Sequence, residues 1–197
     1  MSAPAKRPSR NHTKLLEAAR ELFVHKGFAA TSTEEIVTLA GVTRGALYHQ
    51  FADKKDLFQA LFLSVLDEVA MELFEQTMSE ITDDRDDLVV GTQIMLDLFS
   101  RSDIKQIVLL DGPVVLGWAE WRDLQAPLHR ALLTHALEHL VDEGLLRKQP
   151  LEPLADLIAG SLMQAGLAIA NAEDSTKAHK IYSKSLKQLL LPLTVSE

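Results

Sequence analysis

The chain has 197 residues, 47% of them hydrophobic, which is enough to bury a sizeable core in one or two domains. It has no cysteine, which excludes disulfides and thiol chemistry, and no uninterrupted apolar run of about 18 residues, so we expect no membrane span. The basic N-terminus MSAPAKRPSRNH is not followed by an apolar run either, so we expect no signal peptide and a cytoplasmic location.

The charge is unevenly distributed along the chain. The formal net charge is −8, yet residues 1–62 hold 9 Lys and Arg against 6 Asp and Glu, a net of +3, while residues 63–197 have a net of −11. A small basic end beside an acidic remainder predicts salt-dependent binding of phosphates. We interpret residues 1–11 as a disordered basic arm; entry of this arm into a minor groove is the alternative.

Two short helical patterns lie on either side of one glycine. Ser32 and Glu35 have the spacing of a capping box and predict a helix start. Gly41 supplies the left-handed backbone conformation that ends this helix. Thr43 can then cap a second helix, Arg44 to Gln50. Two helices joined by a short turn containing glycine predict a helix-turn-helix, whose second helix enters the major groove of DNA.

The next residues fit contact with a nucleic acid. Gly45 costs a helix about 1 kcal/mol against alanine, but its missing side chain allows close approach to DNA. Asp53 can cap a further helix, with Lys54 and Lys55 in its first turn. Because lysines there oppose the helix dipole, an outside anion such as phosphate would explain them. The alternative is an ordinary helical hairpin with a solvated basic face.

Beyond this region the sequence predicts helices and no strands. The helix capped by Asp53 continues toward Met78, and the acidic run at 83–87 is a break. We expect a stop and restart at Asp111-Gly112-Pro113, with proline at a first helical position. The predicted helices after the break are Leu88–Ser100, Ile104–Leu110, Pro113–Leu124, Pro127–Glu143, Pro153–Ala172 and Thr176–Leu191. The fold class is therefore all-α, with about nine helices.

Residues from about His12 to Leu61 closely resemble the DNA-binding domain of the tetracycline-repressor (TetR/AcrR) family. The matching positions are Leu15 to Phe23, Gly27-Phe28, Thr31, Ile36, Ala40 to Val42, Gly45 to Tyr48, Phe51 and Lys54 to Leu57. The resemblance implies an arm at 1–11, a three-helix DNA-binding domain at 12–58, and a helical ligand-binding and dimerisation domain at 59–197. It also implies a bacterial regulator, nucleoid-associated when bound, that binds palindromic double-stranded DNA as a homodimer.

Eight residues are our candidates for DNA contact. Arg44 and its neighbours would read base edges, with Gly45 permitting close approach. Phosphate contacts that fix the register would come from Thr33, Thr43, Tyr48, His49, Lys54 and Lys55.

A ligand cavity in the second domain is a further expectation. Trp118 and Trp121 lie three residues apart, so both rings can share one helix face. With Met95, Phe99 and Met163 they could line an apolar pocket for a small, apolar effector. Plain core packing is the alternative for each of these side chains.

The last two predicted helices carry apolar stripes that suit a subunit interface. In the resembled family these helices pair with their copies as a four-helix bundle, although two such helices could also pack inward. The stripes include Leu157, and the residues expected at the interface are Leu154, Ile158, Leu162, Ala165, Ile181, Leu186 and Leu189.

One motif would suggest different chemistry. His135, Glu138 and His139 have the H-x-x-E-H spacing of some zinc peptidases, and two histidines four residues apart can hold a metal. The motif is short, and no phosphate loop or catalytic triad accompanies it, so we expect no enzyme, catalytic residue, metal or cofactor. The resulting hypothesis is a homodimeric repressor released from its operator by a ligand. The alternatives are a ligand-independent regulator or activator, and a helical metalloenzyme.

Overall fold

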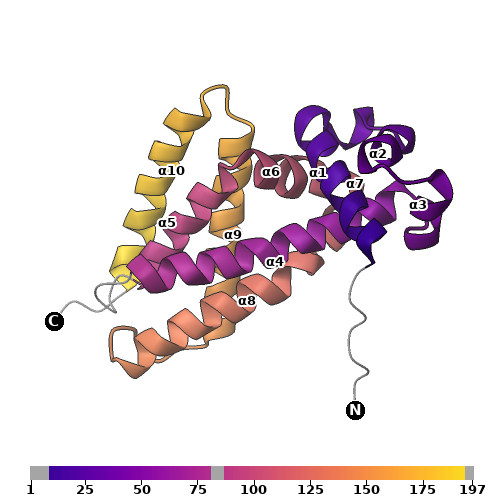
Figure 1. The fold of residues 1–197 in the computed structure, drawn as a ribbon. Coiled ribbons are helices and arrows are strands. Elements are labelled where there is room, and N and C mark those ends of the chain that lie inside the picture. The colour runs from indigo at the N-terminus through magenta and orange to yellow at the C-terminus, as the bar shows by residue number, and fades with distance from the viewer. Residues whose placement is uncertain (1–8, 81–86, 194–197) are drawn as a thin grey trace, which may run out of the picture.

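The computed structural model describes residues 9–80 and 87–193, and this part of the chain is helical without a strand (Figure 1). When the consecutive α6, η2 and α7 are taken as one, it has nine helices, so the predicted all-α class is confirmed. The elements are α1 (Arg10–Ala30), α2 (Thr33–Ala40), α3 (Arg44–Gln50), α4 (Lys54–Glu80), α5 (Asp87–Phe99), α6 (Ser102–Ile104), the π-helix η2 (Lys105–Asp111), α7 (Gly112–Val115), α8 (Trp118–Asp142), α9 (Leu151–Ala170), α10 (Ser175–Leu190) and the 3-10 turn η3 (Leu191–Leu193).

Helices α1 to α3 form a small unit at one end of the molecule (Figure 1). Its core is built from side chains that are fully buried, namely Leu15, Phe23, Ile36 and Leu47. The ring of Phe23 lies 5.6 Å from that of Phe58 in α4, centroid to centroid. The unit is therefore anchored on the first turns of α4.

Helix α4 has 27 residues and runs from this unit along the second half of the molecule (Figure 1). The boundary expected between residues 58 and 59 lies inside it, so no linker separates the two regions. Leu57, Leu61, Val65 and Val69, spaced four residues apart, are buried along one side of it. A displacement of α4 would therefore be passed directly to α1–α3.

The stop expected at Asp111-Gly112-Pro113 is wrong. The chain stays helical from α6 through η2 to α7, and Asp111 and Gly112 both have right-handed helical backbone angles. The break comes later, at Gly117, whose φ of 88° is positive. The wider π turn accommodates Pro113, so the proline does not start a new helix.

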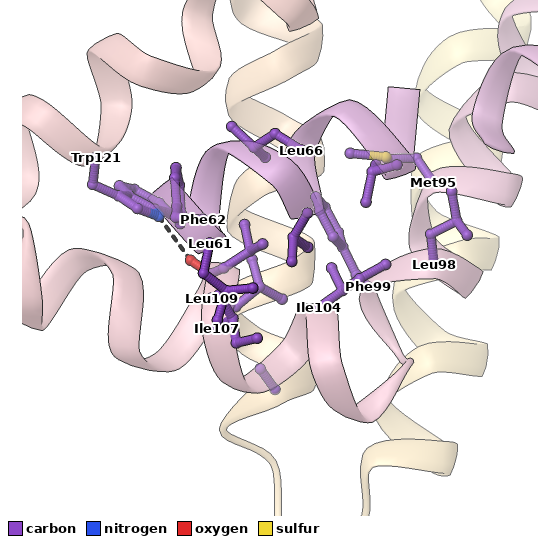
Figure 2. Close-up of a cluster of buried hydrophobic side chains, with 14 of the residues drawn as sticks. Leu61, Phe62, Leu66, Met95, Leu98, Phe99, Ile104, Ile107, Leu109 and Trp121 are labelled. Carbon is purple, nitrogen blue, oxygen red and sulfur yellow. Dashed lines mark hydrogen bonds between the residues drawn. The ribbon is translucent and has the colours of Figure 1, made fainter. Parts of the chain in front are cut away.

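A tryptophan packs on this π-helix. A π-helix pairs each carbonyl with the N–H five residues on, and for Val108 that residue is Pro113, which has no N–H. The indole Nε1 of Trp121 donates to the Val108 carbonyl at 2.7 Å instead (Figure 2). The indole fits because residue 112 is glycine: a Cβ there would lie 2.7 Å from Trp121 Cδ1.

The two helices predicted on either side of Pro127 are one. Helix α8 runs from Trp118 to Asp142 with Pro127 inside it, so the boundaries expected at Leu124 and Pro127 are wrong. The predictions for α5, α9 and α10 are correct to within about two residues at each end.

Among the described helices, α9 is the one whose length and hydropathy would let it cross a membrane. It packs against α5, α8 and α10, and Ala155, Ile158, Leu162, Ala165 and Ile169 are buried there. A core helix passes the same test of length and composition, so α9 does not indicate a membrane protein.

Ion pairs join the N-terminal unit to the second half of the chain. Arg20 of α1 lies 2.7 Å from Glu68 of α4 and 2.5 Å from Asp103 of α6, nitrogen to oxygen. Arg101 lies 2.9 Å from the same Asp103 carboxylate and also pairs with Glu72. These contacts connect α1, α4 and α6 at one place.

Candidate nucleic-acid interface and ligand cavity

The turn between α2 and α3 is built as its sequence predicts. Ser32 and Glu35 form a reciprocal capping box, in which the Ser32 N–H donates to Glu35 Oε2 at 2.8 Å and the Glu35 N–H donates to Ser32 Oγ at 3.2 Å. Gly41 ends α2 with a φ of 62°, and Thr43 Oγ1 accepts the N–H of Ala46 to begin α3. The orientation of α3 is thus fixed by local contacts.

Glu35 has a second function at this corner. Hydrogen bonds from Lys26, and then from the N–H and hydroxyl of Ser32, lower the pKa of Glu35 to about 2. The carboxylate is ionised at neutral pH and ties α1 to the start of α2.

The outer face of α3 presents Arg44, Gly45, Tyr48 and His49 to solvent. The Arg44 guanidinium is 67% exposed, lies 3.1 Å from Glu34 Oε1, and is centred 5.5 Å from the Tyr48 ring. A Cβ on Gly45 would meet only Thr43 Oγ1, at 3.9 Å, so nothing inside the protein requires glycine there. This face carries hydrogen-bond donors, and its side chains have no function in the core.

Thr33 and Lys55, which flank α3 in the sequence, differ in how exposed they are. Thr33 is half-buried at the start of α2, and its hydroxyl donates to Glu34 at 3.2 Å. Lys55 is exposed, with its ammonium 3.4 Å from Glu120 at the start of α8. Lys55 thus remains accessible to an anion while contacting the second half of the protein.

Lys54 has an internal role that the sequence did not predict. Its ammonium donates to the carbonyls of Phe28 and Thr31, at 2.8 and 2.7 Å, and lies 4.1 Å from the centre of the Phe28 ring. Burial lowers the pKa of Lys54, and nearby Asp111 partly counteracts this. An outside phosphate is not needed to explain this lysine, although its contact with DNA stays a prediction.

An apolar cavity of about 380 Å³ lies between α4, α5, α8 and α9. Met95 and Phe99 of α5 line it, as predicted, together with Leu132 of α8 and Leu162 of α9. Phe74 and Met78 of α4 also line it and are exposed, so the cavity reaches the surface beside α4.

The other expected lining residues are not at this cavity. Trp121 is buried against η2, and Trp118 is 59% exposed, although the two rings do share a face with centroids 5.0 Å apart. Met163 does not line the cavity either. These three side chains therefore lie outside this cavity, and for Trp121 the reason is the π-helix, whose Val108 carbonyl holds the indole.

The sequence reasoning missed His129, which lines the cavity from α8. Its signal was present: His129, Leu132, Leu133 and Ala136 share one helix face at spacings of three and four residues. His135 and His139 of the H-x-x-E-H motif line the same cavity, whereas Glu138 is exposed. In the described ranges, no group of three or more His, Cys, Asp and Glu side chains is placed to hold a metal.

The expected interface residues divide into two sets. Ile158, Leu162, Ala165 and Leu186 are buried within the protomer, which leaves them little surface to offer a second subunit. They belong to the inward stripes, which the sequence could not distinguish from outward ones. The exposed large hydrophobic side chains on α9 and α10 are instead Leu157, Ile181, Tyr182 and Leu189, and Leu154 is half-buried.

Two family models match the chain. "Bacterial regulatory proteins, tetR family" covers residues 15–61, and "Tetracyclin repressor-like, C-terminal domain" covers residues 86–193. This chain belongs to the TetR family. It is a DNA-binding transcriptional regulator of the repressor type with a helix-turn-helix.

Individual relatives agree with this assignment. The crystal structure of a TetR-family transcriptional regulator from Pectobacterium atrosepticum is 31% identical, covers 98% of this chain and 99% of its own, and superposes with a TM-score of 0.86. The Transposon Tn10 TetC protein of Escherichia coli is 26% identical over 83% of this chain and 82% of its own length. The regulator TtgR of Pseudomonas putida is 33% identical over 81% of this chain, which spans 64% of that relative.

Proposed function

We propose that this protein is a homodimeric repressor of the bacterial cytoplasm that binds a palindromic operator and leaves it when a small, apolar molecule fills the cavity. The observation that carries the proposal is the outer face of α3, where Arg44, Gly45 and Tyr48 have no part in the core. A short helix whose first residues are exposed and rich in donors suits readout of a major groove.

Each residue expected to contact DNA has a specific role in the proposal. Arg44 exchanges its contact with Glu34 for base edges, and Gly45 allows the backbone to approach. Phosphates are bound by Thr33, Thr43, Tyr48, His49 and Lys55, which fix the register. Lys54 first positions α1 against α4 through its two carbonyl contacts, and contributes a positive charge near the backbone of the DNA.

The exposed side chains of α9 and α10 support the proposed dimer. Leu157, Ile181 and Leu189 would be covered by their copies in a two-fold four-helix bundle. A dimer presents two recognition helices about 34–36 Å apart, one turn of DNA. A single α3 contacts only a few base pairs, so two linked copies are needed for tight binding to an operator.

The cavity is the proposed effector site. Its volume of about 380 Å³ and its mostly apolar lining are typical of small-molecule pockets. Because α4 both lines the cavity and anchors α1–α3, a ligand can favour a state in which the two recognition helices are wrongly spaced. It can change DNA affinity only by its differential affinity for the two states.

The DNA-reading role is tested with Arg44→Ala. We expect it to cost about 1–3 kcal/mol of operator binding and to relax the sequence preference, because a base contact is lost. Tyr48→Phe should weaken binding more evenly across sequences. An operator is first obtained by in vitro selection of bound DNA, and affinities are then measured by fluorescence anisotropy. If Arg44→Ala bound the selected operator as tightly as the wild type, the base-reading role would be excluded.

The effector role is tested by a thermal-shift screen of apolar small molecules, followed by release of labelled operator DNA. A compound that binds the native state raises the apparent melting temperature. If no compound both stabilises the protein and releases DNA, the ligand-independent regulator replaces the proposed one.

A further inference from the structure

The polar groups of the cavity are concentrated on one wall. Helix α8 contributes three imidazoles, from His129, His135 and His139. Apart from these, the polar side chains lining the cavity are two threonines, of which Thr92 donates its hydroxyl to Val89 in its own helix at 2.9 Å. Recognition of a polar group on a ligand therefore falls mainly to the imidazoles of α8.

The ionisable side chains on this wall are either neutral or positively charged. Among the described lining residues, α4, α5 and α9 contribute no ionisable group, and α8 contributes only its three histidines. Burial lowers the pKa of His129 from its ordinary value, so its imidazole is neutral at neutral pH. The wall can gain a proton, but the described lining residues include no carboxylate to pair with a cationic ligand, and a cation buried among them would be uncompensated.

We propose that the effector is an apolar molecule with one carboxylic acid group, and that His129 receives this group. This inference rests on the proposed function of the cavity as the effector site. The ligand enters as the carboxylate with its apolar body against Met95, Phe99 and Leu132. His129 takes one proton from solvent, and the resulting imidazolium donates a hydrogen bond to a carboxylate oxygen. The buried pair is then neutral overall, and no covalent bond changes.

The test compares three probes with the same apolar chain: decanoic acid, decan-1-ol and decylamine. Binding to the full-length protein is measured by isothermal titration calorimetry near neutral pH. A charge-assisted hydrogen bond should give the wild type about tenfold or greater preference for decanoic acid over the alcohol. Decylamine should bind more weakly than the alcohol.

Three variants separate the imidazole from the apolar lining. His129→Leu should reduce the preference for the acid to about none, because the group that pairs with the carboxylate is removed. Leu132→Ala should weaken acid and alcohol alike, since both share the apolar contact. His129→Gln keeps a hydrogen-bonding group of similar size that cannot be protonated. It provides the same comparison if the leucine variant does not fold.

Proton uptake gives a readout that altered packing would not change. Titrations in two buffers with different ionisation enthalpies should show uptake of a proton when decanoic acid binds the wild type. No such uptake should occur with decan-1-ol, or with decanoic acid and either His129 variant.

The acid proposal is overturned if the alcohol binds as tightly as the acid, if the preference survives in both His129 variants, or if no probe binds. Release of operator DNA distinguishes this result from failure of the effector site itself. If other apolar compounds from the screen release DNA while decanoic acid does not bind, the acid assignment fails and the effector site stands. If decanoic acid binds as expected but no compound releases DNA, the regulatory role fails.

Discussion

At the scale of single residues, Gly45 is expected to affect stability and DNA binding in opposite directions. It lies in the first turn of α3 with a solvent-exposed face, and a Cβ there meets no atom closer than 3.9 Å. Gly45→Ala should therefore raise the free energy of unfolding by about 0.5–1 kcal/mol, because alanine loses less backbone entropy in a helix. The same methyl group should weaken operator binding by preventing close approach. Urea denaturation and fluorescence anisotropy measure the two effects.

Gly91→Ala is the matched control for Gly45. Gly91 lies inside α5 on the wall of the cavity, far along the chain from α3, and an added Cβ makes an ordinary contact with Thr77 of α4 at 3.7 Å, which requires no displacement of that helix. It should stabilise the protein without affecting ligand-free operator binding. Tighter or unchanged DNA binding by Gly45→Ala would show that the glycine serves another purpose.

At the scale of elements, the π-helix and α8 depend on one another through Gly112 and Trp121. Gly112→Ala places a methyl group 2.7 Å from Trp121 Cδ1 and 3.1 Å from the Ile107 carbonyl, so the indole must move. We expect a loss of about 1–3 kcal/mol of stability, which is typical of overpacking. In a Trp118→Phe background the emission of Trp121, the other of the two tryptophans, should shift to the red because its ring becomes more exposed.

Trp121→Phe tests the hydrogen bond of this element by itself. It leaves the Val108 carbonyl without the indole donor, and it should also destabilise the protein without any steric clash. If Gly112→Ala left both the emission and the stability unchanged, the indole would not be confined as described.

What could be predicted from the sequence was set by contacts close in the chain. The capping box of Ser32 and Glu35, the left-handed Gly41 and the cap of Thr43 involve neighbours within three residues, and all are present. At Pro127 the sequence predicts a break, because a proline inside a long helix is disfavoured locally. The helix continues through it, since α8 packs against α9.

The site was less predictable because its members meet only in the folded chain. The residues next to Trp121 in the sequence do not predict its contact with the Val108 carbonyl, which lies 13 residues away. Ile158 and Leu157 are equally apolar, but one faces the core and the other solvent. Which stripe of α9 faces inward depends on α5, α8 and α10, and a periodicity alone does not specify that choice.

At the scale of the whole molecule, the ion pairs of Asp103 connect the DNA-binding unit to the rest. Burial raises the pKa of Asp103, but hydrogen bonds from Arg101 and Arg20 outweigh it and lower the pKa to about 2, from an ordinary 3.8. A carboxyl with a lowered folded-state pKa stabilises the fold above its unfolded pKa, and this contribution is lost as the pH falls from about 4 toward 2. The contribution is about 1–2 kcal/mol, less than the full shift implies because Arg101 is partly exposed.

The pH dependence is measured by urea denaturation of the wild type and Asp103→Asn. The difference in unfolding free energy should be largest near neutral pH and should shrink as the pH falls below about 4. Asp123→Asn, at an exposed site where the carboxylate lies 3.0 Å from the neighbouring Arg122 guanidinium, is the control and should show little difference at any pH. A difference that stays constant from neutral pH to pH about 3 would contradict the assignment.

The assembly of two subunits depends on which apolar side chains remain exposed. Leu157 of α9 is 71% exposed and Leu189 of α10 is 58% exposed, so a charge at either position should leave the protomer folded. In the dimer both would be covered, and Leu157→Asp or Leu189→Asp should yield a folded monomer in analytical ultracentrifugation. Because the second recognition helix is then no longer tethered, operator affinity should fall by about a hundredfold or more.

Val114→Asp is the matched control, because Val114 is 82% exposed but lies on α7, outside the proposed bundle. It should remain a dimer with unchanged operator affinity. Ile158→Asp should instead unfold the protomer, since Ile158 is buried and an unpaired charge there is costly. Helical circular dichroism distinguishes unfolding from dissociation. A Leu157→Asp protein that stays dimeric and binds DNA fully would place the subunit contact elsewhere, and α9 would then serve only the core.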